Sequence, residues 1–240
     1  MTEHIVKSFE EELEQLSTHV SKMGGLAEAQ LRSAIECVTR RDLKLASQTV
    51  THDQHLDELE LLIENDAVKM IALRQPMALD LREAMSAIKI ASDLERIGDL
   101  AKNISKRALI MFDDYETPTR LVQGLSRMGK LAHAQLNMVL DAYVNRDASV
   151  AKKVWLSDEE IDEMYNSVFR ELLTYMMEDP RTIGVCTHLL FVAKNIERIG
   201  DHATNIAETV SYLVTGHRVT EARPKRDQTS TTPVGSDLPE

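Results

Sequence analysis

The chain repeats itself once, and this repeat constrains the fold more than any other feature of the sequence. The segment LAEAQL at 26–31 returns as LAHAQL at 131–136, and the pentapeptide Glu-Arg-Ile-Gly-Asp at 95–99 returns unchanged at 197–201. Other matches follow in the same order, with offsets that drift from 105 to 102 residues. Ordered self-similarity of this kind indicates two copies of one structural unit within the 240 residues.

Each copy has the composition and spacing expected of three helices. Aromatic residues make up only 4% of the chain, which favours helix over sheet. Breaks are expected at Arg41-Asp42 and at Gln75-Pro76, with Asp42 as a helix N-cap, while Pro118 and Pro180 lie close to helix starts. The helices are predicted at residues 4–39, 43–73, 78–112, 118–145, 148–178 and 181–214.

The last helix of each copy carries an apolar stripe with the spacing of a bundle interface. The stripes consist of Ile90, Leu94, Ile97, Ala101, Ile104 and Ala108 in the first copy, and of Val192, Ile196, Ile199, Ala203, Ile206 and Val210 in the second. Short connections make successive helices antiparallel. We therefore predict an all-α fold of two tandem, pseudo-symmetric three-helix bundles, at residues 1–115 and 116–215. Residues 216–240 are rich in Pro, Ser and Thr, and are predicted to form a disordered tail.

The charge of the chain restricts its binding partners. The net charge is −11, and residues 217–240 contribute nothing to it because their charges balance. An acidic body repels nucleic acid and anionic lipid, and it attracts cations or basic proteins. We expect a cytoplasmic protein without membrane insertion. The amino terminus does not resemble a signal peptide, no apolar run could span a membrane, and Cys37 and Cys186 show no disulfide spacing.

Four acidic pairs at i, i+4 spacing are the candidate functional residues. They are Asp53 with Asp57, Glu95 with Asp99, Asp158 with Asp162, and Glu197 with Asp201. Spacing of four places both carboxylates of a pair on one helix face, where like charges destabilise an isolated helix slightly. Counted from the turns at Pro76 and Pro180, the two pairs of each copy reach the same height on antiparallel helices. The sequence therefore predicts one oxygen-rich cation site in each bundle.

The predicted sites are shallow and open to solvent. At about 100° per residue, the acidic pairs point away from the apolar stripes. Ferritin-like di-iron bundles instead hold their ligands in the core and use Glu-x-x-His, a spacing that none of the eight histidines here provides. Oxygen ligands suit Mg, Mn or Ca, and iron is possible, while His52, His55 or His202 would make a site more suitable for Zn or Fe. Metal identity stays open.

Two further observations bear on these sites. Gly98 and Gly200 lie inside the repeated motifs, although a glycine within a helix costs about 1 kcal/mol relative to alanine. The close approach of another helix, a partner or a hydrated ion would explain them. A single outward acidic pair is usually only a solvated surface, and duplication can preserve residues for packing alone. Repetition at matching height in both copies favours cation binding. The sequence contains no catalytic motif that we recognise.

The motifs resemble those of a known family, the PhoU proteins. The similarity spans about residues 5–215, and it rests on Asp-Leu-Arg at 80–82, Asp-Leu-Glu-Arg-Ile-Gly-Asp at 93–99 and Asn-Ile-Glu-Arg-Ile-Gly-Asp-His-Ala-Thr-Asn-Ile at 195–206. The resemblance implies an E(D)xxxD motif in each bundle that binds metal ions or multinuclear metal clusters at the protein surface. The matching positions are Glu95 and Asp99, and Glu197 and Asp201. The height argument adds four further candidate ligands: Asp53, Asp57, Asp158 and Asp162.

The same resemblance implies a regulator and not an enzyme. PhoU proteins are cytoplasmic, often dimeric, negative regulators of phosphate uptake that connect the phosphate ABC transporter PstSCAB to the sensor kinase PhoR. The transporter ATPase PstB and PhoR are therefore the expected partners, together with a second copy of the chain. Two alternatives stay open: a metal-dependent hydrolase or metal-storage protein, and a PhoU-like partner of another phosphate transporter.

Overall fold

The structure is a computed structural model that describes residues 2–114, 119–221 and 223, and it contains helices without strands over these ranges. The helices follow the two predicted copies closely. The elements are α1 (Thr2–Arg40), α2 (Leu43–His52), α3 (Gln54–Arg74), α4 (Leu79–Asp114), α5 (Thr119–Val144), α6 (Ala148–Leu156), α7 (Asp158–Glu178), the short 3-10 helix η1 (Pro180–Thr182) and α8 (Ile183–Thr215).

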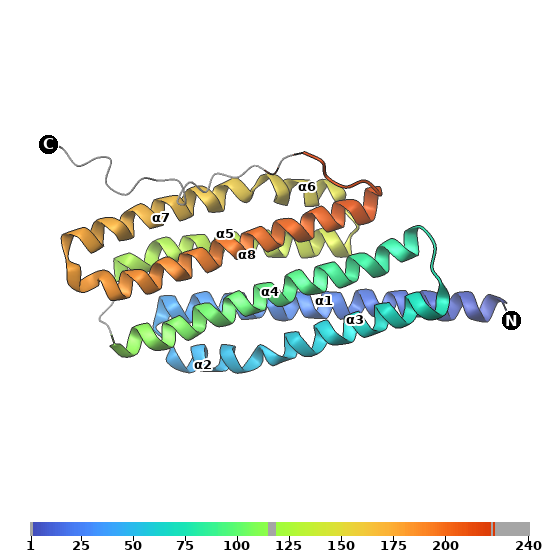
Figure 1. The fold of residues 1–240 in the computed structure, drawn as a ribbon, viewed down its shortest axis with the longest axis horizontal. Coiled ribbons are helices and arrows are strands. Elements are labelled where there is room, and N and C mark those ends of the chain that lie inside the picture. Colours follow the sequence, from blue (N-terminus) through green and yellow to red (C-terminus); the bar gives the residue numbers. More distant parts are fainter. Residues whose placement is uncertain (1, 115–118, 222, 224–240) are drawn as a thin grey trace.

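The two copies fold into two elongated bundles that lie side by side (Figure 1). The first bundle contains α1, the α2–α3 pair and α4, and the second contains α5, the α6–α7 pair and α8. The predicted fold class, two tandem three-helix bundles, is confirmed. The second predicted helix of each copy is divided into two, α2 and α3 in the first copy and α6 and α7 in the second. The prediction of single helices at 43–73 and 148–178 is therefore wrong at one point in each copy.

Local hydrogen bonding accounts for both interruptions. At the first, the Leu56 amide donates to the Asp53 carbonyl at 2.9 Å, and the Asp57 amide reaches the same oxygen at only 3.4 Å. At the second, the Ser157 hydroxyl donates to the Val154 carbonyl at 2.9 Å. Bonds over three residues tighten the turn and change the direction in which the following side chains point. A new helix, α3 or α7, therefore begins beside the predicted carboxylates in each copy.

The predicted N-cap is present, and the repeat reproduces it. Asp42 Oδ1 accepts a hydrogen bond from the Leu45 amide at 2.9 Å, and Asp147 Oδ1 accepts one from the Ser149 amide at 2.8 Å. The residue before each cap, Arg41 or Arg146, has a positive φ that ends the preceding helix. The two copies thus use the same device at corresponding positions.

The apolar stripes of α4 and α8 form the centre of each bundle. All twelve residues of the two predicted stripes are fully buried, which confirms the spacing argument. Both cysteines are also buried and unpaired. No described helix is long and apolar enough to cross a membrane.

The two bundles pack through α1 on α5 and through α4 on α8. Glycines at corresponding positions allow the first contact: a Cβ on Gly24 would lie 2.5 Å from Leu140 Cδ2, and a Cβ on Gly129 would lie 2.7 Å from Ile35 Cγ1. Between α4 and α8, Asp93 Oδ1 lies 2.8 Å from His202 Nδ1 and accepts a hydrogen bond from Asn205 Nδ2 at 3.2 Å. The interface combines close backbone approach with a polar network.

The chain turns back after α8. Gly216 ends the helix with a φ of 78°, a conformation that favours glycine. Residues 217–221 then run back beside α6 in a non-helical conformation (Figure 1). Most of the predicted disordered tail, residues 222 and 224–240, lies outside the described residues.

We predict that Asp93→Ala destabilises the chain by about 1–2 kcal/mol, because His202 and Asn205 lose a shared partner at the half-buried bundle interface. Urea unfolding followed by far-UV circular dichroism at pH 7 measures this change. Glu14→Ala, which removes an exposed carboxylate from α1, is the control. Equal effects of the two substitutions would contradict the proposed role of the network.

Candidate functional site

The structure gathers the eight predicted carboxylates into two groups of four. We call them the first cluster (Asp53, Asp57, Glu95 and Asp99, from the α2–α3 junction, α3 and α4) and the second cluster (Asp158, Asp162, Glu197 and Asp201, from α7 and α8). The charges of Asp53 and Asp99 act on Asp57, and those of Asp162 and Asp201 act on Glu197. The counting of residues from the turns therefore placed the pairs correctly. The helix starts at α3 and α7 also point the positive ends of their dipoles toward the carboxylates.

A lysine lies within the first cluster. The Lys102 ammonium group donates to Asp53 Oδ2 and to Asp99 Oδ1, and so joins the two helices. Burial acts to lower the pKa of Lys102, but its bonds to Asp53 and Asp99 outweigh this effect and raise the pKa above its usual range. Lys102 is therefore a permanent internal counter-ion.

A glutamine from α1 completes this arrangement. Gln30 Nε2 donates to Asp53 Oδ1 at 2.7 Å and to the Gly98 carbonyl at 3.1 Å. Gln30 belongs to the repeated segment LAEAQL, and its counterpart in the second copy is Gln135. Both glutamines are buried polar residues in an otherwise apolar helix face. That combination, repeated at the same offset, was a signal of a functional position that the spacing argument overlooked.

The other carboxylates of the first cluster resist ionisation. Burial, followed by repulsion from Asp99, raises the pKa of Glu95 to about 7. Burial and the Asp53 charge raise the pKa of Asp57, although its side chain is exposed. Glu60, which we did not predict as a site residue, adds negative charge next to Glu95, and burial raises its own pKa too. Two cationic side chains lie next to these acids: Lys102, and the exposed Arg96, which lies 3.5 Å from Glu95 Oε2 and 3.8 Å from Asp99 Oδ2.

An arginine from beyond α8 lies within the second cluster. Arg223 contacts both oxygens of Asp158, with Nε at 3.0 Å from Oδ2 and Nη2 at 2.9 Å from Oδ1. The same Nη2 lies 2.9 Å from Asp201 Oδ1. Thr204 Oγ1 also donates to Asp158 Oδ1, at 3.2 Å. The paired geometry is the fork-like contact that a guanidinium makes with a carboxylate. No pattern in the sequence singled out Arg223, because it lies in the segment predicted to be disordered.

Glu197 of the second cluster is almost fully buried. Its Oε1 accepts a hydrogen bond from Lys194 Nζ at 3.0 Å, and this lysine also lies over the Tyr165 ring. Its Oε2 is buried and has no hydrogen-bond partner among the described residues. Burial, and then the Asp201 charge, raise the pKa of Glu197 to about 7. A buried carboxylate oxygen without a partner is a position at which a cation would be stabilised.

The prediction that these sites are shallow and open to solvent is wrong for half of the residues. Relative exposure is only 4% for Asp53, 2% for Asp158, 3% for Asp162 and 4% for Glu197. For Asp158 and Asp162 the angular argument assumed one continuous helix, whereas the interruptions at Asp53 and Ser157 change the phase of the residues that follow. Glu197 lies on the uninterrupted α8, so this reason does not apply to it. Asp57 remains exposed, as predicted, and Asp99 and Asp201 are half-buried.

The glycines of the repeated motif are explained by helix packing. A Cβ on Gly98 would clash with Leu56 Cδ1, and a Cβ on Gly200 would lie 2.8 Å from Ile161 Cδ1. Leu56 and Ile161 therefore occupy the space that larger residues would fill. Of the three explanations for these glycines, the structure shows the close approach of another helix.

The donor chemistry fits a hard metal ion, but the present arrangement does not form a metal site. Carboxylate oxygens suit such ions, and the buried Glu197 Oε2 has unmet binding capacity. Within the described part of the chain, no three His, Cys, Asp or Glu side chains are placed to share a metal ion. Lys102 and Arg223 contact the carboxylates instead. His52 and His55 stack on each other beside Gln30, and His202 bonds to Asp93.

Comparison with known proteins identifies relatives along nearly the whole chain. The model of the PhoU domain matches residues 20–108 and 125–210, one match in each bundle. The chain is 56% identical to a phosphate-specific transport system accessory protein PhoU homolog of Caulobacter vibrioides, over 95% of this chain and 98% of that protein. It is 52% identical to the protein of the same description from Rhizobium meliloti, over 95% and 96%.

Solved structures give the same result. The fold matches the crystal structure of PhoU from Pseudomonas aeruginosa with a TM-score of 0.83 and 39% identity, over 87% of this chain and all of that one. It also matches the phosphate transport system regulatory protein PhoU from Streptococcus pneumoniae, with a TM-score of 0.81 and 29% identity, over 88% and 99%.

We predict that Lys102→Met destabilises the chain by on the order of 2 kcal/mol, because the buried Asp53 loses its cationic partner. Lys106→Met, one turn further along α4 and exposed, is the matched control. Urea unfolding at pH 7 in a metal-free buffer measures both. A loss no larger than that of the control would show that Asp53 does not depend on Lys102.

We predict that Glu197→Gln stabilises the chain increasingly as the pH rises. The folded pKa of about 7 lies above the ordinary value of 4.5, so the folded state binds more protons than the unfolded state between these values. Wild-type stability therefore falls as the pH rises through this window, by on the order of 3 kcal/mol in total, and the glutamine variant escapes this loss. Thermal unfolding at pH 4.5, 6 and 8 tests this, with exposed Glu171→Gln as the control. A variant–wild-type difference that does not grow with pH would contradict it.

Proposed function

Because this chain belongs to the PhoU family, we propose that it is an accessory protein of the phosphate-specific transport system and a negative regulator of phosphate uptake. The observation that supports this proposal is the end-to-end match to the Caulobacter vibrioides protein, which includes both bundles and leaves almost none of that protein uncovered. The Streptococcus pneumoniae relative is named a regulatory protein, which supports the regulatory part.

In this proposal the chain is an adaptor and not a catalyst. It would link the ATPase of the phosphate ABC transporter, PstB, to the sensor kinase PhoR, on the cytoplasmic side of the membrane and as a homodimer. The net charge of −11 favours basic partner surfaces. The relatives are named for an accessory role, and the alternative of a metal-dependent hydrolase or storage protein has less support. Binding of purified PstB and of the PhoR cytoplasmic region tests the adaptor role directly.

The carboxylate clusters are the proposed regulatory sites. Glu95 and Asp99 with Asp53 and Asp57, and Glu197 and Asp201 with Asp158 and Asp162, would hold Mg, Mn, Zn or Fe ions. A bound ion would supply positive charge that offsets the mutual repulsion of these acids. In the arrangement described here the protein's own residues do this, since Lys102 and Arg223 neutralise part of each cluster. Elemental analysis of the chain purified without chelators or a metal-affinity column identifies the ion.

We predict that a strain of Caulobacter vibrioides lacking its own homolog regains low expression of a phosphate-starvation reporter, in phosphate-rich medium, when this chain is expressed. The variant Glu95→Gln, Asp99→Asn, Glu197→Gln and Asp201→Asn should restore at most about a tenth of that repression, because the clusters lose the charge that binds cations. Circular dichroism and thermal unfolding confirm that the variant is folded.

The matched control removes the same number of charges from exposed positions. It carries Glu10→Gln, Glu11→Gln, Glu14→Gln and Glu171→Gln, all at exposed positions of α1 and α7. Full repression by the folded cluster variant would overturn the regulatory role of the clusters. Failure of the unmodified chain itself would favour the other alternative, a partner of a different phosphate transporter.

A further inference from the structure

The contact between α1 and α5, which we call the seam, contains the same packing twice. In one half of the seam the backbone at Gly24 approaches the Leu140 side chain, and in the other half the backbone at Gly129 approaches Ile35. The offset of 105 residues between the copies relates these two contacts to each other. A difference between the two halves is therefore not required by the packing of the helices.

One half of the seam holds a cavity of about 330 Å³ whose charged lining is mostly basic. Three cationic side chains and one carboxylate line this cavity, together with a histidine and two hydroxyl groups. Its donor groups come from both helices: Arg32, Thr39 and Arg40 of α1, and Ser126, Lys130 and His133 of α5. This local excess of positive charge occurs in a chain whose net charge is −11.

The other half of the seam lacks the basic residues at the corresponding positions. With the offset of 105, the counterparts of Arg32, Arg40, Lys130 and His133 are Asn137, Asn145, Gly25 and Glu28. Among the described residues, no atom from another part of the chain lies within 4 Å of the position that a Cβ on Gly25 would occupy. A longer side chain would therefore fit there. Because one half packs without the basic set, its presence in the other half indicates a role other than packing.

The neighbouring acids do not neutralise this positive charge. Arg40 pairs with Glu36, and Arg32 Nη1 lies 3.9 Å from Glu28 Oε1. The two arginine side chains are 74% and 62% exposed, and exposed pairs of this kind contribute little free energy. Lys130 is exposed, and its ammonium group has no hydrogen bond or ion pair among the described residues. A ligand can therefore recruit all three cations at low cost.

The arrangement suits an anion with more than one phosphoryl group. Arginine presents a planar fork of donors that matches phosphate oxygens, and lysine adds a compact positive charge. Arg32 and Arg40 are eight residues apart, which is about 12 Å along α1, so one phosphate group cannot lie directly beside both positions. A volume of about 330 Å³ is also at the lower end of the range for small-molecule sites. Both observations fit two linked phosphoryl groups.

We propose that this cavity binds a ligand with two or more linked phosphoryl groups, either a free pyrophosphate or a nucleoside diphosphate. Arg32 of the first bundle and Lys130 of the second would contact the ligand from opposite sides of the seam, so the ligand would connect the two bundles. The site is separate from the carboxylate clusters and needs no metal ion. A phosphate compound would then act on the regulator at the bundle interface. This last consequence rests on the proposed function, whereas the binding does not.

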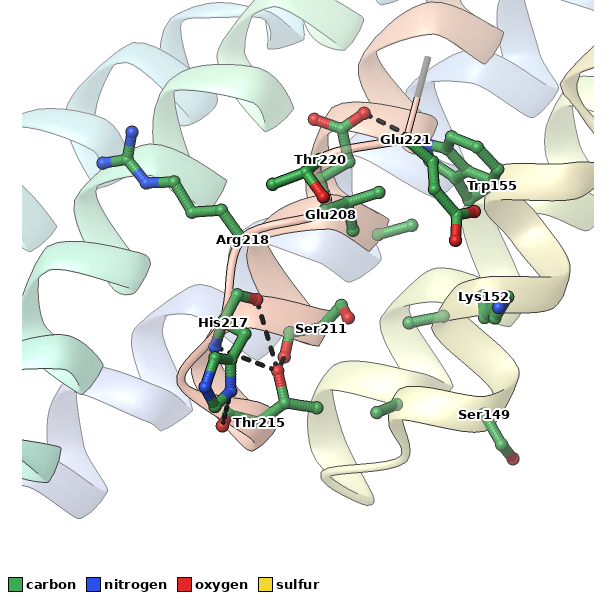
Figure 2. Close-up of a pocket in the computed structure, with 14 residues that line it drawn as sticks. Ser149, Lys152, Trp155, Glu208, Ser211, Thr215, His217, Arg218, Thr220 and Glu221 are labelled. Carbon is green, nitrogen blue, oxygen red and sulfur yellow. Dashed lines mark hydrogen bonds between the residues drawn. The ribbon is translucent and has the colours of Figure 1, made fainter. Parts of the chain in front are cut away.

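A second cavity, of about 500 Å³, provides a comparison. It lies between α6, α8 and the segment that follows α8 (Figure 2). Its charged lining is balanced, with Lys152 and Arg218 against Glu208 and Glu221. The exposed Lys152 is therefore a matched control for Lys130, because it is a lysine that lines a cavity without an excess of positive charge.

Isothermal titration of the full chain, at constant ionic strength and without divalent cations, tests the site. We expect pyrophosphate to bind at one site per chain, and inorganic phosphate to bind at least about tenfold more weakly because it makes fewer charge-assisted hydrogen bonds. Lys130→Ala and Arg32→Asn should each weaken pyrophosphate binding by about tenfold or more. Arg32→Asn introduces the residue that the other half of the seam carries at this position. Lys152→Ala should leave the affinity unchanged.

Sulfate and ADP, titrated in the same way, complete the test. Sulfate binding as tight as that of pyrophosphate, or equal weakening in Lys152→Ala, would show a general charge effect and overturn the site. Phosphate binding as tight as that of pyrophosphate would overturn the requirement for two phosphoryl groups, and no binding of pyrophosphate or ADP would overturn the proposal as a whole. Tighter binding of ADP would support the site with a nucleoside diphosphate as its ligand. Tighter binding of pyrophosphate would support it with a free inorganic ligand.

Thermal unfolding provides an independent readout. Because the ligand would contact both bundles in the folded state only, saturating pyrophosphate should raise the unfolding temperature of the unmodified chain and of Lys152→Ala. The double variant Arg32→Asn, Lys130→Ala should show no such rise, although without ligand it should unfold close to the unmodified chain, since both residues are exposed. A rise of equal size in the double variant would contradict the assignment. The reporter experiment involves neither residue, so failure of this site and failure of the proposed function are distinguishable.

Discussion

The structure depends on buried carboxylates that pair with cationic side chains of the same chain. A buried carboxylate is costly unless a cation or hydrogen-bond donors compensate it. Asp53 and Asp158, at the start of α3 and α7, are the points where this requirement is strictest. Lys102 and Gln30 meet it in one bundle, and Arg223 and Thr204 meet it in the other. These contacts connect α1, α3 and α4 in the first bundle. In the second bundle they connect α7, α8 and the segment after α8.

Much of the fold follows from periodicity, and part of the site does too. The stripe residues, the caps and the pairing of carboxylates across antiparallel helices depend on rise and phase, which are regular along a helix. Burial of the carboxylates could not be predicted in this way. Near Asp53, Asp158 and Asp162, short-range hydrogen bonds at Asp53 and Ser157 interrupt the helices, and these bonds leave no periodic signal.

The counter-ions differ in how far the sequence reveals them. Lys102 lies three residues after Asp99, on the same helix face, so a search for cations near the motif would have found it. Arg223 is about 20 residues beyond its motif, in a stretch whose composition resembles disorder. Only the path of the chain after Gly216 brings it to Asp158. Two copies with similar backbones can thus differ in their electrostatics, because a segment outside the repeat adds a charged residue to one of them.

The packing of α4 on α8 has a consequence for communication between the two bundles. These helices carry the two repeated motifs, and they are also the helices that meet at the bundle interface through Asp93, His202 and Asn205. His202 follows Asp201 directly, and Asp93 lies two residues before Glu95. A rotation of α4 that moved Glu95 would therefore pull on the neighbour of Asp201 through one hydrogen-bond network. The Asp93–His202 contact therefore lies two residues from Glu95 and one residue from Asp201, and it connects the two helices that carry the repeated motifs.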